Sequence, residues 1–386
     1  MSIDLFFVAA PFFCRSNQEL ATFARRIAAA IVVAGICFLL FPLRFAFARP
    51  EANGWLGAVF DWFRSMDAPF NLFPSLHIAL FSLLVVTYGR LTQGALRVAI
   101  TLWFALIAAS AVLTCQHHVL DVVGGFALAG YCFYSLREVP TAVAFNPNRR
   151  VGSYYAFGAG FLVVLAILFW PYGALLLWPA LSVAIVAAAY HRCGPRIYRK
   201  ANGVLPWSTL WVLGPCLLGQ HLSRCYYRRQ CPAWNAVTNN VWIGSALRKQ
   251  EATAAVQAGV TAVLDVTAEF SAPRAFRTLN YCNIPVLDLT APTTDQLDEM
   301  VQFIATEAKR GIVYVHCKIG YSRSAAAVAA YLIASGTAAS ADTALALLRR
   351  ARPSIVVRPE AIAALAKFEA RQAPELVLAS NESRPL

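Results

Sequence analysis

Residues 316–324 read His-Cys-Lys-Ile-Gly-Tyr-Ser-Arg-Ser, and they decide the fold of the region around them. The apolar run 311–315 before them is typical of a strand, and the alanine-rich run 324–330 after them favours a helix. A tight loop between a strand and a helix points successive backbone N–H groups into one concavity, where the helix N-terminus adds partial positive charge. We therefore predict a phosphate-sized cradle in this loop. Its residues would be Lys318, Ile319, Gly320, Tyr321 and Ser322.

Two side chains in this stretch suit phosphate chemistry. Arg323 could grip a phosphate with its planar guanidinium fork. Cys317 lies at the base of the loop, where the same field would hold it as a thiolate, the nucleophilic form of cysteine. The pattern predicts a cysteine nucleophile beside a bound phosphate.

The Cys-x5-Arg-Ser pattern resembles the dual-specificity branch of the cysteine-dependent phosphatases, over about residues 233–375. The resemblance implies a covalent phosphocysteine intermediate on Cys317, phosphate binding by Arg323, and a Ser324 hydroxyl that helps the thiolate to leave. It also implies an aspartate on a loop some thirty residues upstream that protonates the departing oxygen.

Asp288 fits that acid best, because it precedes Cys317 by 29 positions and follows the apolar run 284–287. Asp265 ends an earlier predicted strand, where an organising role in the loop is as plausible as a catalytic one. Asp295 and Asp298 fall in a polar helical stretch and are expected to be solvated.

The rest of this region alternates between two kinds of segment. Strand-like runs at 261–266, 279–286 and 312–316 are interleaved with helix-like runs at 247–257, 293–309, 324–335, 341–350 and 361–371. Such alternation predicts an α/β fold with a partly parallel sheet.

The first half of the chain has a different composition. Of the 386 residues 59% are hydrophobic and 14% charged, and the apolar excess lies almost entirely before residue 195. Several uncharged runs approach the roughly 20 residues that cross a bilayer. These runs are 27–43, 72–89, 99–114, 122–136, 154–172 and 174–190. We predict a multidomain protein, with an all-α six-helix transmembrane bundle followed by an α/β cysteine-phosphatase domain.

The domains we expect are 1–195 in the membrane, a basic and interfacial linker 196–232, the phosphatase domain 233–375 and a tail 376–386. Lysine and arginine gather on one side of six such spans, which predicts a multi-pass protein of a bacterial inner membrane with both termini and the phosphatase domain cytoplasmic. The segment 204–222 leaves two interpretations open, because it is apolar but broken by proline and glycine. We favour an interfacial segment over a further span.

The membrane half carries titratable residues of its own. His77 follows Phe-Pro-Ser-Leu at the start of the second span, and His117 and Asp121 open the fourth. Four residues apart on a helix, His117 and Asp121 would share a face, so that the carboxylate orients the imidazole as a nucleophile. His77 could protonate the leaving oxygen, while Arg44 and Arg49 would neutralise phosphate on the same side of the membrane.

This constellation resembles the type 2 phosphatidic acid phosphatase superfamily over about residues 40–135. The resemblance implies a phosphohistidine or phospholipid-histidine intermediate on His117, with Asp121 as orienting group, His77 as acid and Ser75 in the substrate-binding motif. The third motif of the family has an arginine where this chain has Ala111, and of its first motif only Arg49-Pro50 is present. These departures look more like the transferase branch, which includes inositol-phosphoceramide and sphingomyelin synthases.

Three functions compete on this basis. The first is a membrane enzyme with two sites that act on lipid phosphates: a cytoplasmic cysteine site that dephosphorylates a phospholipid head group, and a histidine site that hydrolyses or transfers a lipid phosphate. The second is a membrane-anchored tyrosine, serine or threonine protein phosphatase, and the third is a lipid-binding protein without turnover. The net charge of +13 suits anionic lipids, and no nucleic-acid motif accompanies it. Neither site as interpreted needs a metal or another cofactor, and the sequence leaves the oligomeric state open.

Overall fold

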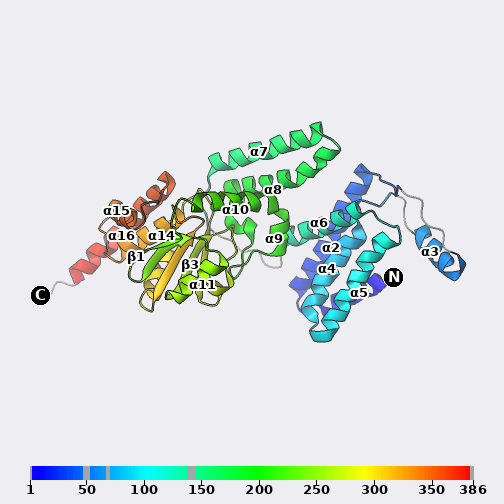
Figure 1. Ribbon diagram of the computed structural model, residues 1–386, viewed down its shortest axis with the longest axis horizontal. Helices are drawn as coiled ribbons and strands as arrows, with labels where there is room; N and C mark the ends of the chain where they lie inside the picture. The colour runs from blue at the N-terminus through cyan, green and yellow to red at the C-terminus, as the bar shows by residue number, and fades with distance from the viewer. Residues whose placement is uncertain (1, 47–52, 67–69, 137–143, 383–386) are drawn as a thin grey trace. The chain divides into compact units, whose positions relative to one another are not determined.

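The structure is a computed structural model that describes residues 2–46, 53–66, 70–136 and 144–382 (Figure 1). The chain forms two compact units, Met1–Pro140 and Thr141–Leu386.

The first unit is helical. Within its described residues the helices are α1 (Ser2–Phe13), α2 (Asn17–Leu40), α3 (Gly54–Met66), α4 (Leu76–Leu91), α5 (Gly94–Leu113) and α6 (Val119–Ser135). A core of α1, α2, α4, α5 and α6 side chains includes Ala79, Leu84 and Phe104. Helices α4 and α6 approach each other closely at Gly125. A Cβ at this position would overlap the carbonyl oxygen of Ser75, which precedes α4.

Among the described residues, four helical segments are long and apolar enough to cross a membrane. They are Asn17–Leu40, Gly94–Leu113, Arg149–Leu168 and Tyr172–Tyr198. The apolar helices α4 and α6 lie where two further spans are predicted, but they are only 16 and 17 residues long. The structure supports a membrane protein with four candidate spans, and the predicted count of six is not confirmed.

The second unit contains a five-stranded sheet in the order β1-β2-β5-β3-β4. Its strands are β1 (Trp234–Thr238), β2 (Val241–Ser245), β3 (Val260–Thr267), β4 (Asn280–Val286) and β5 (Ile312–Cys317). Strands β2, β5, β3 and β4 run parallel, while β1 pairs antiparallel with β2. The prediction of a partly parallel α/β sheet is confirmed, but the hairpin of β1 and β2 was not predicted.

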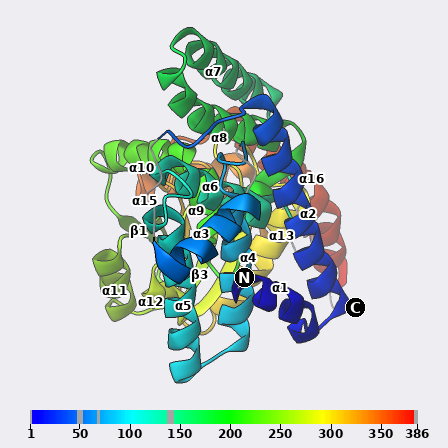
Figure 2. The same cartoon turned by 90° about the vertical axis from the view of Figure 1, so that its right-hand side faces the viewer.

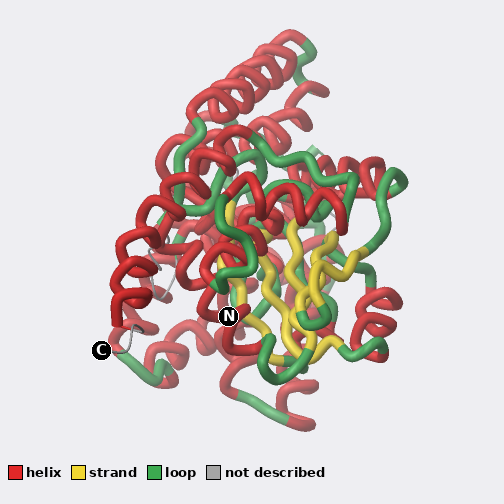
Figure 3. The backbone as a smooth tube through the Cα atoms, turned by 90° about the vertical axis from the view of Figure 1, so that its left-hand side faces the viewer, coloured by secondary structure: helices red, strands yellow, loops and turns green. Residues whose placement is uncertain are grey.

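Helices cover both faces of this sheet (Figure 3). They are α11 (Lys249–Gln257), α12 (Arg274–Arg277), α13 (Thr294–Glu307), α14 (Arg323–Ala334), α15 (Ala341–Ala351) and α16 (Pro359–Glu382). Helices α13 to α16 pack on one face with Val313 and Val315, and α11 and α12 pack on the other with Tyr314. Alternate residues of β5 therefore enter opposite cores, as expected of a central strand. The small side chains of 325–330 are buried, so that α14 can approach the sheet closely.

Two candidate spans belong to the same compact unit as the sheet. Helix α7 (Arg149–Leu168) and helix α8 (Leu177–Ala188) pack side by side as a hairpin (Figures 1 and 2). A short helical turn, Tyr172–Leu176, connects them, and two more, Ala189–Cys193 and Gly194–Tyr198, follow α8. The segment 204–222 forms α9 (Trp207–Val212) and most of α10 (Gly214–Arg228). The predicted domain boundaries at 195 and 232 remain predictions.

Candidate active site

Strand β5 delivers Cys317 to the start of a tight loop, as the sequence predicts, and Arg323 opens α14. The Sγ of Cys317 accepts hydrogen bonds from the backbone N–H of Gly320 and the hydroxyl of Ser324, both at 3.3 Å. Gly320 has a φ of +84°, and a Cβ there would lie 2.7 Å from the backbone of Gly244. Only glycine lets the loop turn this tightly around the sulfur.

Arg352 holds the outer side of this loop. Its guanidinium donates to the carbonyl oxygens of Ile319 and Gly320 at 3.0 and 3.2 Å, and it is fully buried. It also bonds the side chain of Asn235 on β1. Because Arg352 binds these carbonyl oxygens on the outer side of the loop, the N–H groups of the loop can face the sulfur of Cys317. This role of Arg352 was not predicted from the sequence.

Arg323 is held in place by a carboxylate that sequence reasoning missed. Its two terminal nitrogens bond the two oxygens of Glu269 at 3.1 and 2.7 Å, and one also donates to the carbonyl of Val286 at 2.8 Å. Arg323 and Glu269 are each 2% exposed. A signal was available, because Glu269 follows β3, the parallel neighbour of β5, and the carboxyl ends of parallel strands meet at one edge of a sheet.

The surroundings of Cys317 favour its thiolate. Burial raises the pKa of the thiol, but Arg323 together with the hydrogen bonds from Ser324 and Gly320 outweighs burial, so that the pKa lies below its ordinary value. A nucleophile at this position would be ionised at a lower pH than a free cysteine.

Asp288, the predicted acid, lies beside this loop. Its carboxylate is 3.1 Å from a terminal nitrogen of Arg323 and 3.2 Å from the Nζ of Lys318. Lys318 also donates to the Oε1 of Gln220, on α10, at 2.7 Å. Burial raises the pKa of Asp288, but the charges of Arg323 and Lys318 lower it by more than burial raises it. The pKa of Asp288 therefore lies below its ordinary value. In the free site Asp288 is a carboxylate that both cations stabilise.

Asp265 has an organising role. Its carboxylate is fully buried and accepts from Lys200 at 2.5 Å and from the hydroxyl of Tyr281 at 2.7 Å. Burial raises its pKa, and the Lys200 charge more than offsets this, so that the pKa falls to about 2. Asp265 does not line the pocket that holds Cys317. Asp295 and Asp298 lie on α13 in exposed pairs with Arg371, as solvated residues should.

Cys317 opens into a cavity of about 590 Å³. Its lining includes Lys318, Tyr321 and Ser322 of the predicted phosphate-binding loop, and also Asp288. The remaining wall includes Gln220, Ser223 and Tyr227 from α10 and Tyr155 from the candidate span α7. The pocket is thus built jointly by the α/β layer and by helices that precede it in the chain.

The histidine constellation lies in the first unit. His117 precedes α6 instead of lying on it, so the two residues do not share a helix face as expected. Its Nδ1 is nevertheless 3.8 Å from Asp121, which sits in the first turn of α6. The ring of His77 lies with its centroid 5.9 Å from that of His117. The structure brings these three side chains together.

The remaining predicted residues of this constellation are Ser75, Arg44 and Arg49, and their predicted part in substrate binding stays a prediction. Ser75 is buried and caps α4 through the N–H of Ile78, while its own N–H bonds the carbonyl of Asp121. Arg44 is exposed and lies over the ring of Phe70 at 4.4 Å. Arg49 lies outside the described residues. Across the part of the chain that is described, no cluster of three His, Cys, Asp or Glu side chains could hold a metal ion.

Comparisons with known proteins cover both units. Residues 3–135 match the family model of the PAP2 superfamily, and residues 241–371 match that of the dual specificity phosphatase catalytic domain. Both resemblances inferred from the motifs are confirmed.

Curated relatives match the second region. Mouse dual specificity protein phosphatase 19 is 39% identical over 105 residues, or 26% of this chain and 46% of that protein. Human phosphatidylglycerophosphatase and protein-tyrosine phosphatase 1 is 40% identical over 87 residues, or 22% and 43%. The chain spans less than half the length of these two relatives. A crystal structure of PTPMT1 in complex with PI(5)P is 25% identical and covers 38% of this chain and 99% of that one, with a TM-score of 0.35.

Proposed function

We propose that this chain, in which a PAP2 superfamily domain precedes a dual specificity phosphatase catalytic domain, is a membrane phosphatase that removes phosphate from a phospholipid head group at Cys317. One observation carries the choice of a lipid substrate: the wall of the Cys317 pocket includes Tyr155 of the candidate span α7 and Gln220 of α10. A substrate in this pocket would therefore contact a candidate span, α7, as well as α10.

Helix α10 supports this choice. Leu218, Leu222 and Tyr226 recur every four residues on its outer face and are each about 60% exposed. Gln220 and Ser223 face the pocket from the same helix. A helix with an exposed apolar stripe and a polar inner face is suited to lie in a membrane interface. The pocket would then open beside the head groups, which also agrees with the expected interfacial position of 204–222.

The chemistry follows from the geometry. The Cys317 thiolate attacks phosphorus, the bond to the lipid oxygen breaks, and Asp288 gives its proton to that oxygen. Water, deprotonated by the Asp288 carboxylate, then attacks the phosphocysteine, and the thiolate leaves with a hydrogen bond from Ser324. Arg323 and the loop N–H groups bind the phosphate oxygens in both steps.

Asp288 must be protonated to act as the acid, although Arg323 and Lys318 stabilise its charged form in the free site. A bound phosphate carries negative charge into the space between these cations. It competes with the carboxylate for them and raises the Asp288 pKa, so that substrate binding itself prepares the acid.

A substrate comparison tests the proposal. Purified protein that carries His117→Ala, which silences the histidine site, should in mixed vesicles release phosphate from an anionic phospholipid monoester faster than from a phosphopeptide at equal concentration. The further change Cys317→Ser should abolish the release. Faster turnover of the phosphopeptide would favour a membrane-anchored protein phosphatase, and release by the Cys317→Ser/His117→Ala protein would exclude Cys317 as the nucleophile.

The first unit supplies a second candidate site. His117, with Asp121 at 3.8 Å and the ring of His77 nearby, has the groups for a phosphohistidine step on a lipid phosphate. Water as acceptor would give hydrolysis, and a lipid hydroxyl would give head-group transfer. Incubation of Cys317→Ser protein with a labelled phospholipid and an acceptor lipid distinguishes the two: label in a new lipid means transfer, and a water-soluble label means hydrolysis. No reaction in that variant would exclude the second site.

A further inference from the structure

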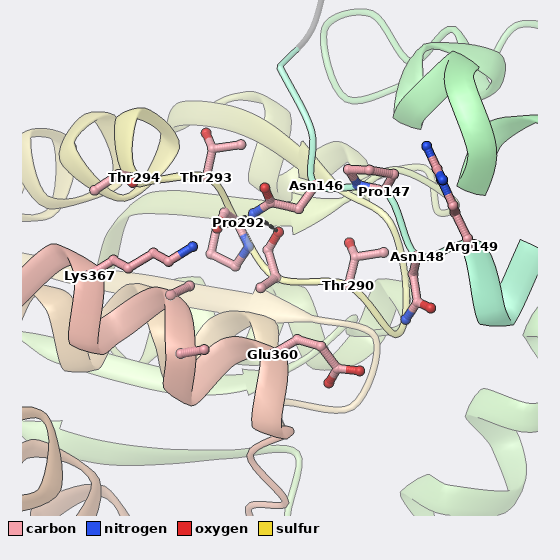
Figure 4. Close-up of a pocket in the computed structure, with 13 residues that line it drawn as sticks. Asn146, Pro147, Asn148, Arg149, Thr290, Pro292, Thr293, Thr294, Glu360 and Lys367 are labelled. Atoms are coloured by element: carbon pink, nitrogen blue, oxygen red, sulfur yellow. Dashed lines mark hydrogen bonds between the residues drawn. The ribbon is translucent and has the colours of Figure 1, made fainter.

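Three side chains at the base of the α7–α8 hairpin donate hydrogen bonds to the loop that carries Asp288. The hydroxyl of Tyr190 donates to the carbonyl of Asp288 itself at 2.8 Å. The Nδ2 of Asn148 donates to the carbonyl of Leu289 at 2.9 Å. The Nδ2 of Asn146 donates to the carbonyls of Ala291 and Pro292 at 3.1 and 2.9 Å (Figure 4). Four carbonyls of the loop 288–292 are thus engaged by the hairpin.

These donors are themselves fixed. The Oδ1 of Asn148 accepts a hydrogen bond from the N–H of Val151 and so caps α7. The backbone N–H of Asn148 donates to the carbonyl of Tyr190. Tyr190 is 1% exposed and stacks on Tyr155 with ring centroids 5.5 Å apart. The base of the hairpin is a rigid element from which the donors reach the loop.

The loop needs such support at one position. Leu289, the residue after Asp288, has a φ of +58°, in the left-handed region that a leucine rarely adopts. A backbone in such a conformation persists only where its surroundings hold it. The carbonyl of this same residue accepts the bond from Asn148.

The loop also has space into which it could move. A cavity of about 670 Å³ lies beside it, lined by Asn146, Asn148, Thr290, Pro292, Glu360 and Lys367 (Figure 4). Packing alone therefore does not hold this side of the loop in place. The hydrogen bonds from the hairpin hold it.

We propose that Asn148, Asn146 and Tyr190 are positioning residues for the general acid, so that the membrane hairpin aims the Asp288 carboxyl at the leaving oxygen. This inference rests on the proposed phosphatase reaction at Cys317. It makes the acid step depend on a part of the chain outside the residues that match the phosphatase family, 241–371.

Asn148→Asp tests the inference with minimal change of shape. The aspartate keeps an oxygen to cap α7 but replaces the donor to Leu289 with a second oxygen, which repels the carbonyl. We expect kcat for an alkyl phosphate, the phospholipid monoester, to fall about tenfold or more, since general-acid catalysis contributes on the order of 10²–10⁴. For 4-nitrophenyl phosphate, whose leaving group needs little protonation, kcat should fall less than about threefold, and KM for either substrate should change little.

Three further variants complete the test. Ser153→Ala, on the exposed part of α7, is the matched control and should leave the ratio of the two rates unchanged. Asp288→Asn defines the full loss of the acid. The double variant Asn148→Asp/Asp288→Asn should be no slower than Asp288→Asn alone, because both changes act on one group.

The outcomes separate this inference from the proposed function. If Cys317→Ser/His117→Ala is inactive but Asn148→Asp slows both substrates equally, slows neither, or adds its full loss to that of Asp288→Asn, the hairpin does not position the acid. If Cys317→Ser/His117→Ala keeps its activity, the proposed function fails first.

Discussion

The Cys317 site and the His117 site differ in how completely their surroundings define them. At the first site, Cys317, Arg323 and Asp288 each have charged or hydrogen-bonding partners within about 3.3 Å. Around His117, the nearest carboxylate oxygen is 3.8 Å away, and its Nδ1 has no hydrogen-bond partner among the described residues. The first site is preorganised by the fold, whereas in the second the His117 Nδ1 and the Asp121 carboxylate lie near each other without a hydrogen bond between them.

The difference has a structural cause. A strand–loop–helix unit places its nucleophile, its N–H groups and its arginine within one short stretch of backbone. The histidine site assembles residues from the start of α4, the turn before α6 and the first turn of α6, so its geometry depends on helix packing. Preorganised donors contribute most when they need not move during the reaction.

The largest expected effect tests this preorganisation at Arg323. Arg323→Lys keeps the charge but loses the fork that bonds both oxygens of Glu269. We expect kcat/KM for the phospholipid monoester to fall about 10²- to 10³-fold, similar to the loss of one oxyanion donor. The matched control is Arg371→Lys in an exposed pair, which should change the rate less than twofold. A change of less than about tenfold at Arg323 would mean that charge alone suffices.

The next effect concerns stability. Lys200→Met leaves the buried carboxylate of Asp265 without its cation, and the loss of one partner of a buried pair costs about 3–5 kcal/mol of unfolding free energy. A denaturant titration of the protein in detergent measures this loss of unfolding free energy. Lys200→Met/Asp265→Asn removes the unpaired charge and should recover part of the loss. No difference between the single and the double variant would contradict the assigned role of the pair.

The same pair predicts a pH window. Because the pKa of Asp265 is lowered to about 2 in the folded chain, its contribution to stability is fully present above the ordinary aspartate pKa of about 4. The contribution is lost as the pH falls from about 4 towards about 2. Acid unfolding curves of the wild type and of Lys200→Met should therefore converge below about pH 2, since both then carry a protonated Asp265. Curves that stay equally far apart throughout would contradict this linkage.

Much of the Cys317 site could be predicted from the sequence, because its chemistry lies within nine consecutive residues. Asp288, which the sequence predicts as the acid, lies beside this loop and contacts Lys318. It could not identify Glu269, Arg352 or Gln220, since their partners are 54, 32 and 98 residues away in the chain. The strands β1 and β2 escaped prediction because each is only five residues long and the alternation of side chains is weak.

A smaller effect concerns the thiol. The pKa of Cys317 should lie below the value of about 8.5 for a free cysteine. Alkylation by iodoacetamide at a series of pH values, followed by mass spectrometry of the peptide that contains Cys317, measures it. In Ser324→Ala, which removes one hydrogen bond to the sulfur, the pKa should rise, though less than in Arg323→Lys if the fork matters as argued. A thiol that titrates at or above 8.5 in the wild type would contradict the field around the loop.

The smallest expected effect is the most direct test of whether the two regions work separately. The chain forms two compact units, and among the described residues those that line the Cys317 pocket all belong to the second. His117→Ala should therefore change phosphate release at Cys317 by less than about twofold while it removes any lipid-phosphate reaction at the histidine site. His118→Ala is the matched control, because His118 stacks on Phe45 and bonds Ala46 on the other side of the same turn. If His117→Ala slowed both reactions and His118→Ala slowed neither, the two sites would act in sequence on one substrate. The Cys317 site and the His117 site would then carry out two steps of a single reaction.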